Sequence, residues 1–295
     1  MAEKNASKAS EKKFDIYQTV TDRIIEQLKQ GNIPWQKPWG GIASGAFNRV
    51  SKKPYSFINQ MLLQHDGEYA TYKQWAKLGG KIKSGAESEI VVFWKITPIT
   101  ETDKNGEEVT KKIPFLRYYR VFHISQIEGV EPLDASIAIE HEPIEVAEKI
   151  KNDYAEREGI EIREVAGDKA FYSVACDHIV LPLMEQFKDI NEYYSTLFHE
   201  MTHSSGAKHR LGRFNVDAKI AAFGSPEYSV EELIAECGSA FLMNHCGIET
   251  DKTFNNSVSY IQGWIAALSD NKRMIVTAAS RAEKACKFIL DVEMS

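Results

Sequence analysis

The pentapeptide His199-Glu200-Met201-Thr202-His203 is the feature that most constrains how this sequence can fold. It lies in a segment, 189–205, whose apolar residues recur at helical spacing, and Gly206 follows as a helix-ending residue. Side chains four residues apart lie on one face of an α-helix, so both imidazoles can reach one metal ion. Glu200 stands beside them and can take a proton from water. The sequence therefore predicts a metal-binding helix with Glu200 as the general base.

A catalytic zinc site needs a third protein ligand, and three residues compete for this role. Glu232 lies in the first turn of a second predicted helix, which starts near Ser229. Ser229 and Glu232 also match a capping box, in which Glu232 would stabilise the helix start instead of binding metal. His209 completes the spacing HExxHxxGxxH, which is typical of metzincins. Glu236 lies one turn beyond Glu232, either as a ligand itself or as a residue that orients an imidazole. We favour Glu232 as the ligand and Glu236 as the orienting residue.

The order of predicted elements indicates an α+β protein with two domains. A disordered basic arm at 1–13 precedes a first domain at 14–128. A linker at 129–143 leads to a second domain at 144–295. Two strands, Glu89–Ile99 and Phe115–Ile124, flank an Asn-Gly turn signal and predict a long β-hairpin in the first domain.

The charge of the chain is divided between its halves. Residues 1–128 carry 20 basic and 14 acidic side chains, whereas residues 129–295 carry 16 and 28. Opposite signs in the two halves support a domain boundary and suggest a polyanionic partner for the first half alone.

The basic half also interleaves aromatic rings with cations, which is what unpaired bases and phosphates need. The predicted contacts to single-stranded DNA are Trp35, Lys37, Trp39, Arg49, Lys52, Lys53, Tyr55, Asn59, Lys81 and Lys83. The alternative for each tryptophan is a place in the core of a small, loop-rich domain.

Composition excludes several classes of protein. Uninterrupted apolar runs such as Ile90–Trp94 are far shorter than the ~20 residues of a membrane helix, and the polar N-terminus does not resemble a secretory signal. Four cysteines without CxxC spacing are typical of reduced, buried thiols. We expect a cytoplasmic protein that does not contact a membrane.

Taken together, these segments resemble the ArdC family of plasmid-encoded antirestriction proteins. The N-terminal resemblance depends on Gly31-x-x-Pro34-Trp35-x-x-Pro38-Trp39, on Asn48 with Pro54-Tyr55-x-x-x-Asn59, and on the strand segments Val91–Lys95 and Arg120–Phe122. The C-terminal resemblance depends on Asp177–Pro182, the HExxH motif and Glu231–Glu236. The family usually has serine at the position of His209, which favours the helix carrying Glu232.

The resemblance implies an N-terminal domain that binds single-stranded DNA and a C-terminal zincin-like metallopeptidase domain with Zn²⁺ or another divalent metal. It also implies that the protein protects incoming plasmid DNA from host restriction, with an unidentified protein substrate. Two alternatives stay open. In one, the protein is a DNA-binding shield whose metal site is purely structural. In the other, it is a soluble metalloprotease whose basic half docks a protein.

Overall fold

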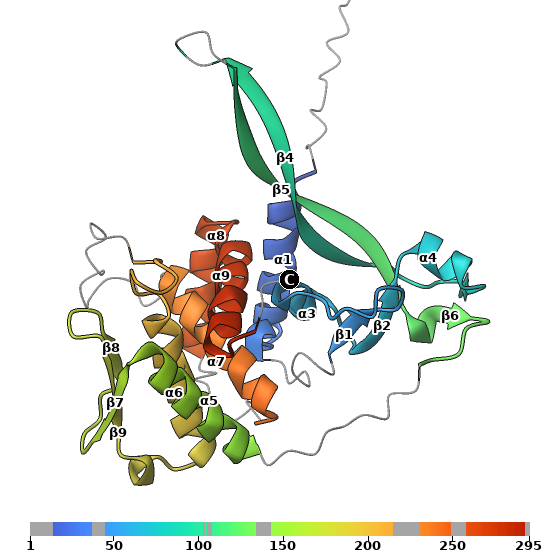
Figure 1. Ribbon diagram of the computed structural model, residues 1–295. Helices are drawn as coiled ribbons and strands as arrows, with labels where there is room; N and C mark the ends of the chain where they lie inside the picture. The colour runs from blue at the N-terminus through green and yellow to red at the C-terminus, as the bar shows by residue number, and fades with distance from the viewer. Residues whose placement is uncertain are drawn as a thin grey trace, which may run out of the picture.

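The computed structural model describes residues 14–36, 45–102, 104, 108–133, 143–214, 230–248 and 258–292. The predicted arm at 1–13 and most of the predicted linker, 134–142, lie outside these ranges. Within them the chain has the predicted α+β architecture, and its N-terminal and C-terminal halves each contain helices and a sheet (Figure 1).

The N-terminal half begins with helix α1 (Ile16–Lys29), whose first turn is capped by the Asp15 carboxylate, 3.0 Å from the backbone N–H of Tyr17. A four-stranded sheet has the order β1-β2-β5-β4, and β3 pairs with β6. The other elements of this half are η1 (Pro34–Gln36), β1 (Ala46–Asn48), α3 (Phe57–Leu62), β2 (Gly67–Ala70), α4 (Tyr72–Lys77), β3 (Lys81–Ile82), β4 (Glu89–Thr102), β5 (Glu108–His123), η2 (Ile124–Gln126) and β6 (Ile127–Glu128).

The predicted long hairpin is confirmed. Strands β4 and β5 pair antiparallel from Glu89 opposite Val121 to Thr102 opposite Glu108. The pairing extends beyond both predicted strands, and the far end of the ribbon projects away from the rest of the molecule (Figure 1).

The C-terminal half packs helices against a small three-stranded sheet of order β7-β9-β8. Strands β8 and β9 are joined by a turn, in which Asp177 has a positive φ of 50°. The elements of this half are α5 (Pro143–Glu158), β7 (Glu161–Val165), β8 (Phe171–Ser173), β9 (His178–Pro182), η3 (Met184–Gln186), α6 (Ile190–Ser204), α7 (Val230–Cys246), α8 (Val258–Asp270) and α9 (Met274–Ile289).

Both halves contribute side chains to one hydrophobic core. The ring of Trp35 meets Trp264 edge-on, with centroids 5.8 Å apart, and Phe57 packs on Phe241 at 5.5 Å. The hydroxyl of Thr21 also donates a hydrogen bond of 2.8 Å to a backbone carbonyl between α8 and α9. Dividing the chain near residue 128 would expose these apolar surfaces to water, at a cost of about 25 cal/mol per Å². Function is therefore best tested on the full chain.

The cysteines follow the expectation of buried thiols in three of four cases. Cys237, Cys246 and Cys286 are buried, whereas Cys176 is exposed. None of the helices in the described part of the chain combines the length and the apolar character that a membrane crossing requires.

Candidate metal centre

Helix α6 positions the two histidines of the HExxH motif. The Asp189 carboxylate caps its start by accepting a 2.9 Å hydrogen bond from the backbone N–H of Asn191. Leu197, Phe198 and Met201 are fully buried, while the imidazoles lie at the other side of the helix, partly open to solvent. The Nε2 atoms of His199 and His203 are 3.1 Å apart. The predicted convergence of the two imidazoles is therefore present in the structure.

Helix α7 brings Glu232 to the same point. Its Oε2 lies 3.6 Å from Nε2 of His199, and its Oε1 lies 3.6 Å from Nε2 of His203. All three ligand atoms lie within 4.8 Å of one another. A tetrahedral zinc ion with ligands at ~2.0–2.1 Å would hold them about 3.4 Å apart, so the spacing fits a divalent cation. The Glu232 side chain is 43% exposed, so the site is accessible from solvent.

The close packing of α6 and α7 depends on a glycine. A β-carbon added at Gly238 would lie 2.5 Å from the side chain of Thr202, which is fully buried on α6. A β-branched side chain such as threonine has little freedom to move away. Gly238 therefore allows the close approach that aligns Glu232 with the two histidines.

We expect Gly238→Ala to lower the free energy of unfolding by about 1–3 kcal/mol, because overpacking outweighs the better helix propensity of alanine. Thr202→Ala in the same chain should recover much of this loss, since it removes the atoms that the new methyl group meets. Gly167→Ala is the matched control, because a β-carbon there meets nothing within 4 Å. Urea unfolding of the variants measures the effect, and a single Gly238→Ala variant as stable as wild type would contradict it.

Glu231 and Arg213 surround His203, and sequence reasoning gave neither of them a role. The Nδ1 of His203 lies 3.4 Å from Glu231 Oε1, on the side away from Glu232. Arg213 Nη2 donates to the same oxygen at 2.9 Å and to the backbone carbonyl of Thr202 at 2.6 Å. A carboxylate on the second ring nitrogen fixes the orientation and tautomer of a ligand imidazole. The adjacent acids Glu231 and Glu232 were the sequence signal that could have revealed this role. One of the two carboxylates lies at each ring nitrogen of His203.

The acids also set the protonation of the cluster. Burial alone lowers the pKa of the His203 imidazole, but its interactions with Glu231 and Glu232 outweigh burial and raise the pKa to about 10. The imidazoles of His199 and His203 hold the pKa of the Glu232 carboxyl well below its usual range. A divalent cation binding here has to displace the proton on His203.

Glu200 and Glu236 lie close to this cluster without belonging to it. Glu200 is buried on α6, and its charge favours the protonated form of His203. Glu236 lies one turn beyond Glu232 and beside Tyr260 of α8, and burial raises the pKa of its carboxyl. Among the described residues, no hydrogen bond joins Glu236 to either imidazole. The orienting contact that we expected from Glu236 is instead made to His203 by Glu231.

His209 is not near enough to complete the cluster. Its Nε2 lies 3.2 Å from Asp177 Oδ2, and its side chain is 59% exposed. The cluster of potential ligands found among the described residues contains Glu232 and not His209. The structure therefore does not support a ligand role for His209, because the chain turns after α6 and directs this residue toward Asp177.

Two of the residues predicted to contact DNA belong to the interior. Trp35 has no exposed surface, so its predicted stacking on a base is wrong for this fold. Asn59 is also buried, where its amide donates to the backbone carbonyl of Val92 at 2.8 Å and accepts from the Val92 N–H at 2.7 Å. Both residues therefore hold elements of the fold together.

The other predicted DNA contacts differ in how far they are available. Arg49 is largely buried in an ion pair with Glu68, and Tyr55 is half-buried with its hydroxyl accepting a hydrogen bond from Asn48. Neither is therefore well placed as a free phosphate or base contact. Exposed cations do remain in this half of the protein, namely Lys52, Lys53, Lys81 and Lys83. Lys37 and Trp39 lie outside the described residues.

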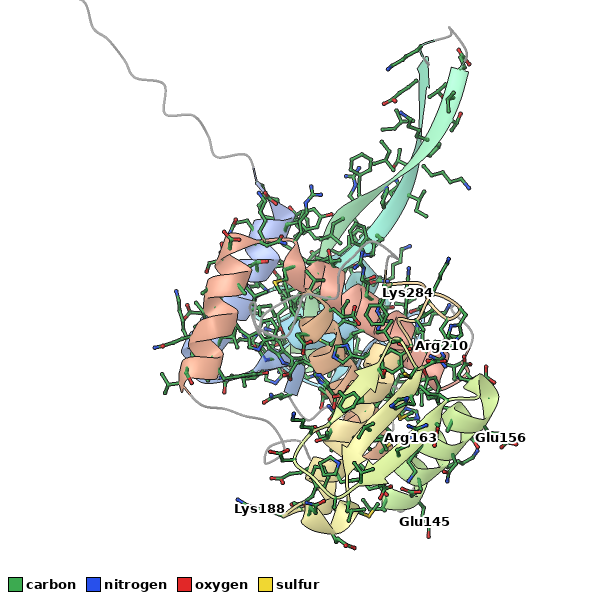
Figure 2. The ribbon with its side chains drawn as sticks, turned by 90° about the vertical axis from the view of Figure 1, so that its left-hand side faces the viewer. Glu145, Glu156, Arg163, Lys188, Arg210 and Lys284 are labelled. Carbon is green, nitrogen blue, oxygen red and sulfur yellow. The ribbon has the colours of Figure 1, made fainter. Side chains whose placement is uncertain are left out.

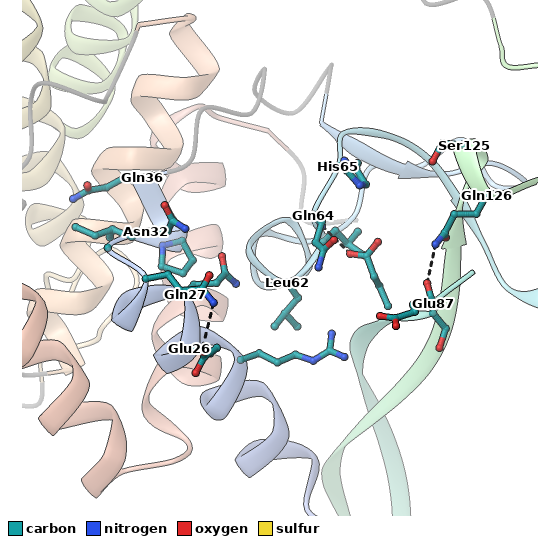
Figure 3. A pocket seen from close by; sticks show the side chains of 18 residues that line it. Glu26, Gln27, Asn32, Gln36, Leu62, Gln64, His65, Glu87, Ser125 and Gln126 are labelled. Carbon is teal, nitrogen blue, oxygen red and sulfur yellow. Dashed lines mark hydrogen bonds between the residues drawn. The ribbon is translucent and has the colours of Figure 1, made fainter. Parts of the chain in front are cut away.

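A cavity of about 960 Å³ lies in the N-terminal half, between α1, the η1 turn and the start of β4 (Figure 3). Its lining contains several carboxamides, but Gln27 donates to a backbone carbonyl of α3 at 3.2 Å and Gln126 to that of Glu87 at 3.0 Å. Glu26, Glu87 and Glu89 outnumber Arg23 in the wall, so its net charge is negative. This charge repels phosphates, so the cavity is a poor candidate for binding a DNA backbone.

Comparison with known proteins matches each half of the chain to a described protein family. Residues 14–122 match the family described as the N-terminal domain of anti-restriction factor ArdC, and residues 149–281 match a zincin-like metallopeptidase family. The protein y4eC of Sinorhizobium fredii is 33% identical over 285 residues, which cover 92% of this chain and 90% of that protein. Two DNA primases TraC of Escherichia coli are 33% and 34% identical, and the chain spans 20% and 28% of their lengths.

Solved structures agree with these matches. The metal-free crystal structure of the antirestriction protein ArdC from plasmid R388 superposes with a TM-score of 0.69 at 32% identity, covering 95% of this chain and all of that one. The Mn(II)-bound structure gives a TM-score of 0.71 at 32% identity, with 94% and 98% coverage. Both halves of the fold and the resemblance carried by the sequence motifs are thus confirmed, and the chain belongs to the ArdC family of antirestriction proteins.

Proposed function

We propose that this protein binds single-stranded DNA, hydrolyses peptide bonds at a divalent-metal centre and protects incoming plasmid DNA from host restriction. The observation that carries the proposal is the convergence of His199, His203 and Glu232 in a domain of the zincin-like metallopeptidase family. The names of its relatives support the plasmid context, since one is an antirestriction protein from a plasmid and others are DNA primases. Restriction acts on DNA in the cytoplasm, where the proposal places the protein.

In this proposal His199, His203 and Glu232 hold the cation, and Glu231 with Arg213 keeps the His203 ring in its ligand orientation. A divalent metal bound there supplies a Lewis acid that polarises the peptide carbonyl and the attacking water. Glu200 takes the proton from that water and passes it to the leaving amine. Its position on α6, directly after His199 and buried beside the two histidines, supports this role.

The ligand set suits zinc, which binds imidazole nitrogen and carboxylate oxygen in open catalytic sites. Manganese is also a candidate, because a related structure is described as Mn(II)-bound. We propose Zn²⁺ as the resident metal, with Mn²⁺ as the competing one.

Metal analysis tests the proposed ligands. We expect about one divalent ion per chain in wild type, and its loss in His199→Ala and in Glu232→Ala. Glu200→Gln should retain the ion, because a general base is not a ligand. His209→Ala is the matched control, and it should also retain the ion. If His209→Ala loses the metal while Glu232→Ala keeps it, the proposed third ligand is wrong.

A further inference from the structure

The β4–β5 hairpin presents two different faces to its surroundings. Directly opposite residues of an antiparallel pair lie on the same face, and alternate residues of a strand lie on opposite faces. Lys95 is opposite Phe115, and Phe93 is opposite Arg117. Tyr119 follows on the same face, opposite the buried Val91. We call the surface formed by Phe93, Lys95, Phe115, Arg117 and Tyr119 the aromatic–basic face.

This face is exposed to solvent. The exposed fractions are 42% for Phe115 and 56% for Tyr119, and Lys95 and Arg117 are exposed as well. The rings of Phe93 and Tyr119 stack almost parallel, with centroids 4.8 Å apart and an interplanar angle of 7°. The ribbon thus holds two rings in a fixed orientation.

The cations on the aromatic–basic face are available for an external partner. Between positions 91–99 and 111–119, every side chain on this face is apolar, neutral or basic. Neither Lys95 nor Arg117 forms an ion pair with any described residue. Toward the tip, Lys111 is by contrast paired with Glu101 at 2.7 Å.

The opposite face of the hairpin is fastened to the body near its base. Leu116 is buried there, Tyr118 packs on Phe14 at 4.9 Å, and Trp94 approaches Tyr17 of α1 at 6.3 Å. These contacts hold the opposite face against the body, and beyond them the ribbon leaves the molecule (Figure 1).

The side-chain spacing on this face suits an unpaired nucleic acid strand. Successive side chains on one face of a strand are ~6.8 Å apart, about twice the ~3.4 Å that separates stacked bases in duplex DNA. A base therefore has room between neighbouring side chains of β4 or of β5. Rings stack on any base and cations follow the phosphates, so no sequence code is needed. A duplex keeps its bases paired and offers only its phosphates.

We propose that the aromatic–basic face of the hairpin is the surface that binds single-stranded DNA, with bases against Phe115 and the Phe93–Tyr119 stack and phosphates at Lys95 and Arg117. This inference rests on the proposed function, and it places the contacts mainly on the ribbon rather than on the loop containing Trp35. Lys52 and Lys53 extend the surface at its base, because they lie two to three residues before Tyr55, which packs against the cluster that contains Val91 and Val121.

Binding of the full-length protein to a fluorescent oligothymidylate tests the proposal. We expect Phe115→Ala to weaken binding by roughly tenfold, from the loss of one stacked base. Arg117→Gln should weaken binding and reduce the salt dependence by about 0.7 in log–log slope, as expected for one phosphate contact in a single strand. Affinity for a duplex of equal length should be insensitive to Phe115→Ala.

The opposite face of the same ribbon supplies matched controls. Ile96→Ala removes an exposed apolar side chain, and Lys112→Gln removes the same charge as Arg117→Gln. Both should bind the oligonucleotide as wild type does. If Phe115→Ala and Arg117→Gln also bind like wild type, the hairpin assignment is overturned while DNA binding itself stands. If wild type does not bind single strands at all, the DNA-binding part of the proposed function is overturned together with this inference.

Discussion

Glu200→Gln should slow peptide hydrolysis by about 10²–10⁴-fold, which is the usual contribution of a general base. Glutamine keeps the size of the side chain but cannot take a proton from the attacking water. The metal ligands are untouched, so the content of divalent metal should stay at the wild-type value. Cleavage of denatured casein, followed by mass spectrometry of the fragments, measures the rate. Equal rates for the two proteins would show that Glu200 is not the base.

The same variant distinguishes the proposed function from a shield whose metal site is only structural. DNA transferred into a restricting host should survive less often when the host carries Glu200→Gln than when it carries wild type. His209→Ala is the control, since this residue lies outside the cluster and pairs with Asp177. Full protection by Glu200→Gln would mean that DNA binding suffices and that hydrolysis is dispensable.

Arg210→Ala should lower the free energy of unfolding by about 3–5 kcal/mol, because it leaves partly buried carboxylates without their cation. The Arg210 side chain, which is labelled in Figure 2, has no exposed surface. It donates to both Asp177 oxygens at 2.7 and 3.0 Å, to Glu158 at 3.2 Å and to the backbone carbonyl of Ser204 at 3.0 Å. The last contact places a positive charge at the C-terminal end of α6, where the helix dipole favours it.

A nearby arginine provides the control for Arg210. Arg163 pairs with Glu161 at 2.6 Å, but both side chains are about half exposed, so Arg163→Ala should unfold close to wild type. Thermal and urea unfolding measure both variants. An Arg210→Ala protein as stable as Arg163→Ala would show that the network around Asp177 contributes little.

The Arg210 network also predicts how the stability of the protein changes with pH. Burial raises the pKa of the Asp177 carboxyl, but its hydrogen bonds to Arg210 and Tyr172 outweigh burial and lower it overall. A carboxylate with a lowered folded-state pKa stabilises the protein fully above its ordinary pKa, near ~4. That stabilisation is lost as the pH falls through the lowered value. Arg210→Ala should therefore lose stability less steeply than wild type below pH ~4.

The sequence predicted those parts of the protein that depend on local spacing. The helix that carries Glu232 was predicted to start near Ser229, and α7 (Val230–Cys246) starts one residue later, with Gly247 directly after its end. The convergence of His199 and His203 likewise follows from a four-residue spacing within one helix. The hairpin was predicted from its strand composition and turn signal, and the observed strands are longer because alternation of side chains continues toward the tip.

The choice between Glu232, His209 and Glu236 needed the tertiary structure. Each was compatible with the sequence, because spacing along the chain does not specify how one helix packs on another. The close approach of α6 and α7 at Gly238 places Glu232 at both imidazoles and leaves Glu231 on the far side of His203. The turn after α6 directs His209 to Asp177.

By itself, the sequence determined the local order of helices and strands and the chemistry of the HExxH face, since both arise from residues within a few turns of each other. Only the tertiary structure decided which aromatic and polar side chains face solvent. Trp35 and Asn59 are residue types that DNA-binding proteins also use on their surfaces, yet the packing of this fold buries both of them. Phe115 and Tyr119 are aromatic residues of a kind often found in cores, yet they lie on a ribbon that leaves the body and stay exposed. Burial depends on contacts between segments distant in the chain, and residue type alone carries no record of those contacts.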